Sequence, residues 1–256
     1  MTKFLAFSCL HAPITHSGYF EWLLGQIEEF KPDVIVNLGD WYEGLASKKF
    51  DSYDDEDWTT EDEHVAVGLQ AEAINAVAPM ARRVWLWGNH DDNLFGKQPG
   101  RIPAGLRSLI KYSRDIEAWK GLKEWDIRAK YSHREKFRLG PITFQHGCAI
   151  SRSAEKDGAY LYGVPFGLYI QGHTHRPVAV SQARERNVLL PYWFANPGTG
   201  MDYDRANYMA RNSMALWGRG VIVGETAGAT QRRSAFASKN WEAELRIHSL
   251  ADERFT

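Results

Sequence analysis

Short apolar runs recur along the chain at residues 3–9, 34–38 and 83–87. Runs in which polar residues do not alternate with apolar ones are typical of strands that are buried on both faces. Residues 17–30 and 60–77, which lie between these runs, carry apolar side chains at helical spacing. The order strand, helix, strand, helix, strand predicts right-handed crossovers and a parallel sheet.

The ends of the second predicted helix carry their own signals. Thr60 and Glu63 are expected to form a capping box at its start, and Pro79 follows its end. The buried face of this helix is predicted to hold Val67, Ala71 and Ile74. Residues 104–127 are expected to form a further, longer helix.

The second half of the chain predicts a different arrangement. Residues 136–139 and 142–145 are expected to form a hairpin around Gly140-Pro141, and residues 153–162 a short helix. Further strands are predicted at 167–171, 178–181, 188–194, 215–223 and 241–247, the last two completing a second, more antiparallel set. These elements indicate an α/β fold with two mixed sheets face to face and helices outside, a four-layer αββα sandwich. Because the sequence shows no repeat and no linker, residues 1–256 are predicted to be one domain.

Composition limits the partners of this protein. Hydrophobic residues make up 44% of the chain and charged residues 25%, and the formal net charge is −1. No overall field therefore attracts nucleic acid or a membrane surface, and no apolar run approaches the roughly 20 residues that span a bilayer. Two cysteines form no disulfide framework and no secretory signal is expected at the start, so the predicted location is cytoplasmic.

Candidate chemistry lies where the predicted strands end. Five apolar runs are each followed by polar side chains of the kind that bind metal ions. The five segments are Ser8-Cys9-Leu10-His11, Gly39-Asp40, Gly88-Asn89-His90-Asp91, His146-Gly147 and Gly172-His173-Thr174-His175. Five of the nine histidines of the chain fall in these segments. Because ligands bind at the carboxyl edge of the sheet in open α/β folds, we expect the five segments to form one site.

With these segments in view, the chain resembles the calcineurin-like metallophosphoesterases. The family pattern is Asp-x-His, Gly-Asp, Gly-Asn-His-Asp or -Glu, His, and Gly-His-x-His, and the same order holds here over residues 8–175. One position departs from the pattern, because Cys9 stands where the family has an Asp. The resemblance implies the αββα sandwich and a phosphate mono- or diester as substrate, which a hydroxide bridging two metal ions attacks.

The resemblance also implies roles for individual residues. It places Cys9, His11, Asp40 and His175 around one metal ion, and Asp40, Asn89, His146 and His173 around the other. His90 would stabilise charge on the phosphate and protonate the leaving oxygen. Asp91 could fix the tautomer of His90, or it could simply begin a helix.

Cys9 has three interpretations. Its thiolate could replace the carboxylate, which would keep the charge of the site and favour Mn, Fe or Zn over Mg, because thiolate is the softer ligand. It could instead mark a site that has lost a ligand, as in a catalytically impaired protein kept as a metal-binding scaffold. The residue could also have been engineered.

Substrate contacts are predicted on loops near the site. Trp41 and Tyr42 directly follow Asp40 and could stack a base, although packing beneath the loop is the plainer interpretation. Arg152 and Arg205 follow site-bearing strands and are candidate phosphate contacts.

Nucleic acid is a weakly supported alternative substrate. A nuclease is suggested by the basic positions Arg101, Arg107, Lys111 and Arg114. The acidic segment at residues 51–57 argues mildly against it, because acidic charge beside the site would repel a polyanion.

Overall fold

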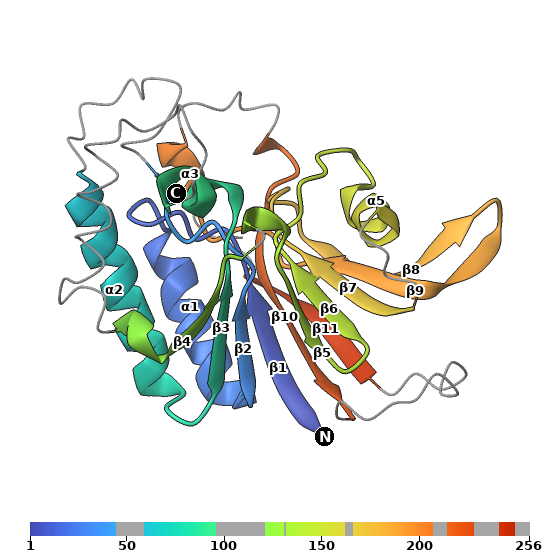
Figure 1. Cartoon of the computed structure of the whole chain (residues 1–256), viewed down its shortest axis with the longest axis horizontal. Coiled ribbons are helices and arrows are strands. Elements are labelled where there is room, and N and C mark those ends of the chain that lie inside the picture. The colour runs from blue at the N-terminus through green and yellow to red at the C-terminus, as the bar shows by residue number, and fades with distance from the viewer. Residues whose placement is uncertain are drawn as a thin grey trace, which may run out of the picture.

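The computed structural model describes residues 1–44, 59–95, 121–130, 132–161, 166–206, 214–227 and 241–248. The first sheet holds, in spatial order, β11 (Trp241–His248), β10 (Arg219–Thr226), β1 (Thr2–Phe7), β2 (Val34–Asn37), β3 (Arg82–Leu86) and β4 (Trp125–Arg128). The second holds β5 (Lys136–Leu139), β6 (Ile142–Gln145), β7 (Gly167–Gln171), β9 (Val188–Asn196) and β8 (Val178–Glu185). Both sheets contain parallel and antiparallel pairs, and they lie face to face (Figure 1).

Helices cover the outer faces of both sheets. α1 (Ser17–Phe30) and α2 (Thr60–Val77) lie against the first sheet, and α5 (Ala154–Leu161) lies against the second (Figure 1). α3 (Asn89–Phe95) begins directly after β3. These layers confirm the predicted αββα sandwich. Within the described ranges, no helix is both long enough and apolar enough to cross a membrane.

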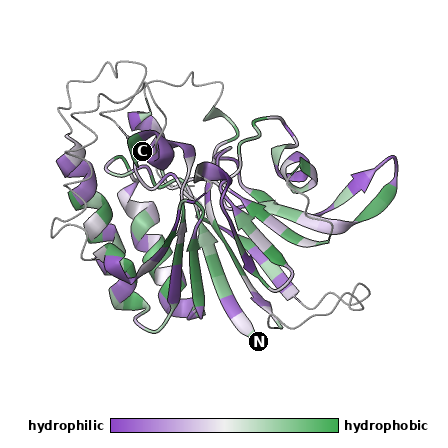
Figure 2. Ribbon diagram, in the orientation of Figure 1, coloured by the Kyte–Doolittle hydropathy of each residue, from purple (hydrophilic) through white to green (hydrophobic). Residues whose placement is uncertain are grey.

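The central strands are buried on both faces, as their continuous apolar runs predict. In β1, Leu5 and Phe7 join the core beneath α1 and α2, whereas Phe4 and Ala6 join the core between the sheets. The Phe4 ring contacts the Phe144 ring of β6 across the interface, with 5.4 Å between centroids. Figure 2 shows the same apolar character along the inner strands. Burial on both faces fixes the strand ends, and therefore the residues that follow them.

The helix signals were correct in kind but not always in position. Val67, Ala71 and Ile74 are buried on α2 as predicted. The capping box is one residue earlier than predicted, because the hydroxyl of Thr59 accepts from the backbone of Asp62. Glu63 has another partner, since its buried carboxylate accepts from the backbone N–H of Gly44 at 2.8 Å.

Two predicted elements are placed differently in the structure. β10 and β11 extend the first sheet rather than the second, because β10 pairs antiparallel with β1 from Thr2 to Ala6. The helix predicted at residues 104–127 is wrong at its end, where a 3-10 helix (Gly121–Glu124) leads into β4 and the Trp125 side chain packs into the core. The rest of that predicted helix lies outside the described residues. The same holds for the acidic segment at 51–57 and for the basic positions Arg101, Arg107, Lys111 and Arg114.

Short 3-10 helices also occur at Ser132–Arg134 and Tyr203–Arg205.

Strand direction brings the polar segments together. β1, β2 and β3 are parallel neighbours, and so are β6, β7 and β9. Carboxyl ends of parallel strands meet at one edge of a sheet. The fold therefore collects the loops after β1, β2, β3, β6 and β7 at the upper edge in Figure 1.

Candidate metal centre

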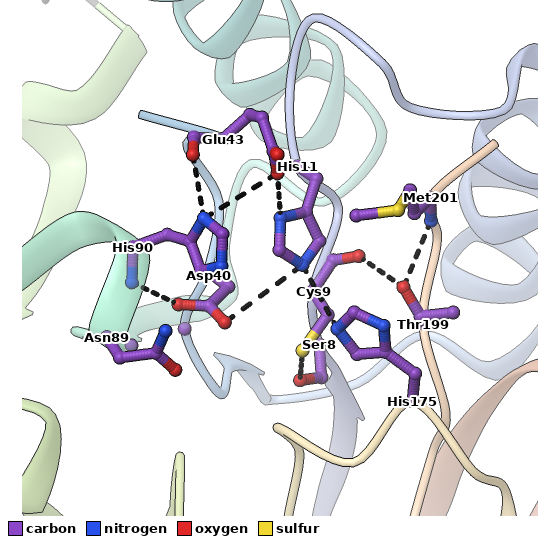
Figure 3. A network of polar contacts seen from close by, with 12 residues as sticks. Ser8, Cys9, His11, Asp40, Glu43, Asn89, His90, His175, Thr199 and Met201 are labelled. Atoms are coloured by element: carbon purple, nitrogen blue, oxygen red, sulfur yellow. Dashed lines mark hydrogen bonds and ion pairs between the residues drawn. The ribbon is translucent and has the colours of Figure 1, made fainter. Parts of the chain in front are cut away.

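The seven predicted ligands meet at this edge. Cys9 and His11 follow β1, Asp40 follows β2, Asn89 begins α3, His146 follows β6, and His173 and His175 follow β7. Candidate ligand atoms of Cys9, His11, Asp40 and His175 lie within 4.8 Å of one another, as do those of Asp40, His146 and His173. Asp40 belongs to both groups. Figure 3 shows the side chains of His11, Asp40, Cys9 and His175 directed toward a common space.

The backbone of these loops has an unusual conformation. Five residues, none of them glycine, have left-handed φ angles of 52° to 65°: Cys9, His11, Asp40, His173 and His175. This conformation costs a residue other than glycine about 1–2 kcal/mol. Backbone hydrogen bonds hold it, among them Cys9 N–H to the Gly39 carbonyl at 2.9 Å and His11 N–H to the Asp40 carbonyl at 3.0 Å. The fold thus maintains local strain where it aims its ligands.

Glycine in three of the motifs allows the loops to approach closely. A Cβ atom on Gly88 would overlap the Asp40 carboxylate, and one on Gly39 would overlap the backbone of Gly88. On Gly172 it would overlap the Ser8 hydroxyl. The glycines beside the ligands are therefore required for packing, whatever binds in the site.

The hydrogen-bonding partner of His11 defines which of its nitrogens can bind a cation. His11 Nδ1 lies 2.5 Å from Glu43 Oε2, and both side chains are fully buried. A carboxylate accepts, so Nδ1 carries the proton and Nε2 keeps its lone pair. That Nε2 faces His175 Nε2 at 3.1 Å and Asp40 Oδ2 at 4.0 Å. Imidazole nitrogens and a carboxylate oxygen that converge in this way can share a cation, so this group fits a metal ion.

The donor atoms of the second group are arranged in a similar way. His146 Nδ1 lies 3.0 Å from the carbonyl of Leu38, which can only accept, so Nδ1 is the donor. The lone pair of Nε2 then faces Asp40 Oδ2 at 3.1 Å and Asn89 Oδ1 at 3.0 Å. The His173 ring lies against the His146 ring, with 5.1 Å between centroids. Three acceptors pointing at one place also fit a cation.

The protonation states agree with metal binding. Burial lowers the pKa of His11, and burial together with the neighbouring His11 lowers the pKa of His175 well below its usual value. Burial and the neighbouring His146 lower the pKa of His173 to about 4. Burial tends to raise the pKa of Asp40, but the imidazoles of His146 and His90 hold it well below its usual range. Neutral imidazoles and a charged carboxylate are the states that bind metal ions.

Cys9 is fully buried beside these ligands. Its sulfur lies 2.9 Å from the hydroxyl of Ser8, and its carbonyl accepts from the hydroxyl of Thr199 at 2.8 Å (Figure 3). Burial, and then the charge of Asp40, raise the pKa of the thiol well above its usual value. Because a coordinating thiol must be deprotonated, binding of a metal at Cys9 would release a proton.

Asp91 does not have the catalytic role that one interpretation gave it. Its buried carboxylate accepts from four backbone N–H groups, those of Gly88, Asp40, Trp41 and Tyr42, at 2.8–3.1 Å. It lies in the first turn of α3, in agreement with the other interpretation. Asp91 therefore fixes the loop that carries Asp40 against the loop that carries Asn89, and His90 has another partner.

That partner is Glu43, which the sequence analysis missed. His90 Nδ1 donates to the backbone carbonyl of Glu43 at 2.7 Å and lies 3.6 Å from its carboxylate (Figure 3). The same carboxylate contacts His11. Burial acts to lower the pKa of His90, but the carboxylates of Asp40 and Glu43 raise it to about 8. The available signal was the position of Glu43, three residues after Asp40 on the same loop.

The predicted aromatic contacts are wrong. Trp41 and Tyr42 are fully buried and offer no face to a substrate. The Trp41 ring contacts the rings of Trp85 and Trp125, and its Nε1 donates to Gln70. Both side chains therefore pack beneath the loop, as the plainer interpretation held.

Several of the candidate ligands line a cleft. It has a volume of about 470 Å³ and is lined by Asp40, Asn89, His90, Ile150, His173, Thr174, His175, Arg176, Leu216 and Trp217. Neither Arg152 nor Arg205 is among these residues, and Arg176 is the one Lys or Arg that lines the cleft within the described part of the chain. The sequence analysis missed Arg176, although it directly follows His175.

A buried polar cluster supports the loop that carries His173 and His175. The Thr174 hydroxyl, between these two predicted ligands, donates to the Glu155 carboxylate at 2.8 Å. Asn196 at the end of β9 donates to the same carboxylate and to the Gly172 carbonyl, both at 2.9 Å. Supporting contacts of this kind orient ligands before a metal binds.

Comparison with known proteins agrees with this geometry. The family model described as calcineurin-like phosphoesterase matches residues 2–177. A search of curated proteins found no match. The chain is similar to a solved structure of a Vps29 single mutant from Entamoeba histolytica, with 12% sequence identity, 96% of this chain and 99% of that chain covered, and a TM-score of 0.42.

Two further solved structures are similar. Vacuolar Protein Sorting 29 from Cryptosporidium parvum shares 12% identity over 97% of this chain and 98% of that chain, with a TM-score of 0.43. YfcE, a phosphoesterase from E. coli, shares 15% identity over 88% and 92%, with a TM-score of 0.38. The family match covers more than half of the chain and includes every residue of the two donor groups. The chain therefore belongs to the calcineurin-like phosphoesterase family.

Proposed function

We propose that this protein is a metal-dependent phosphoric ester hydrolase that acts on a phosphate mono- or diester. The observation that carries the proposal is the Asp40 carboxylate, which is shared between two buried groups of donor atoms. Cys9, His11, Asp40 and His175 would hold one ion, and Asp40, Asn89, His146 and His173 the other. Two ions in such a site supply Lewis acidity and lower the pKa of water, which favours in-line attack on phosphorus.

The mixture of donors favours Mn, Fe or Zn over Mg. Imidazole nitrogens dominate both groups and Cys9 adds a sulfur, whereas Mg prefers oxygen ligands. A convergent donor set with neutral imidazoles also argues against a metal-impaired scaffold. The basic positions that suggested a nuclease lie outside the described residues, so the nuclease alternative stays a prediction. The cytoplasmic location remains a prediction.

His90 is the proposed general acid. Its Nδ1 is engaged by the Glu43 carbonyl, so its Nε2 is the nitrogen that can donate to a leaving oxygen. The residue lines the cleft beside Asn89, and its backbone N–H donates to Asp40 Oδ1 at 2.8 Å. This hydrogen bond links the backbone of the proposed proton donor to the carboxylate that the two donor groups share.

Removal and return of metal test the proposed function. Dialysis against a chelator should abolish hydrolysis of p-nitrophenyl phosphate and of bis(p-nitrophenyl) phosphate. The proposed reaction depends on the Lewis acidity of the metal ions, which the chelator removes. Adding Mn²⁺ or Zn²⁺ should restore turnover of at least one substrate, with about two ions bound per chain by elemental analysis. Two bound ions without turnover of either ester would contradict the proposal.

The pH profile tests the pairing of His90 and Glu43. His90 must be protonated to act as an acid, so kcat should fall as pH rises through its pKa. The Glu43 carboxylate raises that pKa, and its removal must lower it. Glu43→Gln, which keeps an acceptor for His11, should therefore shift the descending limb of the kcat profile to lower pH. An unchanged limb in this variant would show that His90 is not the group that titrates.

A further inference from the structure

The cleft is lined in part by large apolar side chains, which binding of a phosphate group alone does not require. Ile150 and Leu216 line it with 80% and 65% of their surfaces exposed. They come from separate parts of the chain, the loop after β6 and the segment before β10. Large apolar side chains left in water on two separate segments that line one cleft favour an apolar group of a ligand beside them.

Trp217 supplies a rigid aromatic face in the same wall. Its ring contacts the ring of His175, with 4.3 Å between centroids, and that of Tyr203 at 6.0 Å. The next residue, Gly218, donates to the His175 carbonyl at 3.1 Å and accepts from Thr199 N–H at 2.9 Å. The indole is therefore fixed relative to a ligand of the metal centre, and little ordering is needed when a substrate binds.

The charge at the cleft suits a single phosphate group. Among the described residues that line it, Arg176 is the only Lys or Arg. Its guanidinium donates to the Ser151 carbonyl, which anchors it at the rim. Polyanions such as nucleic acids are bound by many cationic contacts, whereas one guanidinium can pair with the oxygens of one phosphate group. A volume of about 470 Å³ is also that of a small-molecule site.

We propose that the cleft selects a small phosphate ester whose organic part carries a planar aromatic ring, of about the size of a nucleotide. The ring would pack on Trp217 between Ile150 and Leu216, and Arg176 would pair with the phosphate. This proposal rests on the proposed phosphoesterase function and names the substrate class of the same site.

The test compares substrates that have the same leaving group. Adenosine 5′-monophosphate and ribose 5-phosphate both release a 5′-hydroxyl and differ only in the base. Adenosine 3′,5′-cyclic monophosphate and ribose 3′,5′-cyclic phosphate form the matching diester pair, in which only the first member carries an aromatic ring. Stacking on an aromatic side chain should raise kcat/KM for the member with a base on the order of tenfold, mainly through KM.

Substitutions of the residues that line the cleft test whether they cause this preference for the base. Trp217→Ala should remove the advantage of the base, Trp217→Phe should restore most of it, and Leu216→Ser should reduce it. Arg176→Ala should lower kcat/KM for both members of a pair alike. The control is Leu189→Ser, which changes an exposed apolar side chain of β9 that does not line the cleft, and it should leave the preference intact.

Several results would overturn the proposal. The first is equal kcat/KM within both substrate pairs. The second is an unchanged preference for the base in folded Trp217→Ala and Leu216→Ser. The third is better turnover of an oligonucleotide than of a nucleotide. If no substrate turns over, the hydrolase function fails, but calorimetry of the Mn²⁺-loaded protein can still compare the binding of adenosine 5′-monophosphate with that of ribose 5-phosphate. Equal affinities there would overturn the aromatic subsite separately.

Discussion

Asp40→Asn should lower kcat by on the order of a thousandfold or more, because the lost charge serves both donor groups. An asparagine has the same size, and its oxygen can still accept from the backbone N–H of His90. It cannot supply the negative charge that faces His146 and His11 at the centre. We therefore expect the variant to fold and to lose much of its bound metal, as measured by elemental analysis beside the kinetics.

Asp33→Asn is the matched control for this substitution. Asp33 lies just before β2, at the opposite end of the strand from Asp40, and accepts from the backbone of Lys3. It makes the same chemical change without touching the centre, so its metal content and kcat should equal those of the parent. An Asp40→Asn protein that kept two ions and parental turnover would refute the shared role of this carboxylate.

Substitutions of Cys9 distinguish a thiolate ligand from a position that has lost its ligand. Cys9→Ala should lower kcat on the order of a hundredfold and weaken one of the two bound ions, because removal of one ligand costs several kcal/mol of metal affinity or transition-state stabilisation. Cys9→Asp restores the family residue and should stay within about tenfold of the parent. Its preference should move from Zn or Fe toward Mn or Mg, since carboxylate is the harder ligand.

A spectroscopic measurement makes this test independent of turnover. Loading with Co²⁺ should give a thiolate-to-metal charge-transfer absorption in the parent that both Cys9 variants lack. Cys148→Ala is the control, because this exposed cysteine is not among the convergent donor groups, and it should keep the absorption. Parental kinetics and metal content in Cys9→Ala would show that the sulfur is not a ligand.

The layers of the fold and the convergence of the candidate ligands could be predicted because both follow from local pattern. Burial on both faces requires a continuous apolar run, as in β1 and β2, and the residues after parallel strands must share an edge. The sheet that β10 and β11 join was not predictable in this way. Their apolar pattern is compatible with either sheet, and pairing of β10 with β1 decides the matter over more than 200 residues of sequence.

The supporting residues depend on contacts that no spacing reveals. Trp41 and Tyr42 lie next to Asp40 in sequence, but the left-handed backbone at Asp40 directs the chain back into the core. Asp91 seemed to be a partner for adjacent His90, yet the backbone groups it binds belong mostly to the loop after β2. Glu43 is one acid among many in the sequence, and only the packed loop brings it to both His11 and His90.

The left-handed angles at Cys9, His11, Asp40, His173 and His175 bear on how this protein could be engineered. Glycine adopts such angles without steric penalty, so a glycine would relieve the backbone strain at each position, but at every position except His173 it would also leave a cavity where a buried side chain now packs. Backbone strain and ion binding therefore place opposite demands on the same five residues. Any directed-evolution scheme for this scaffold should score ion retention together with heat resistance.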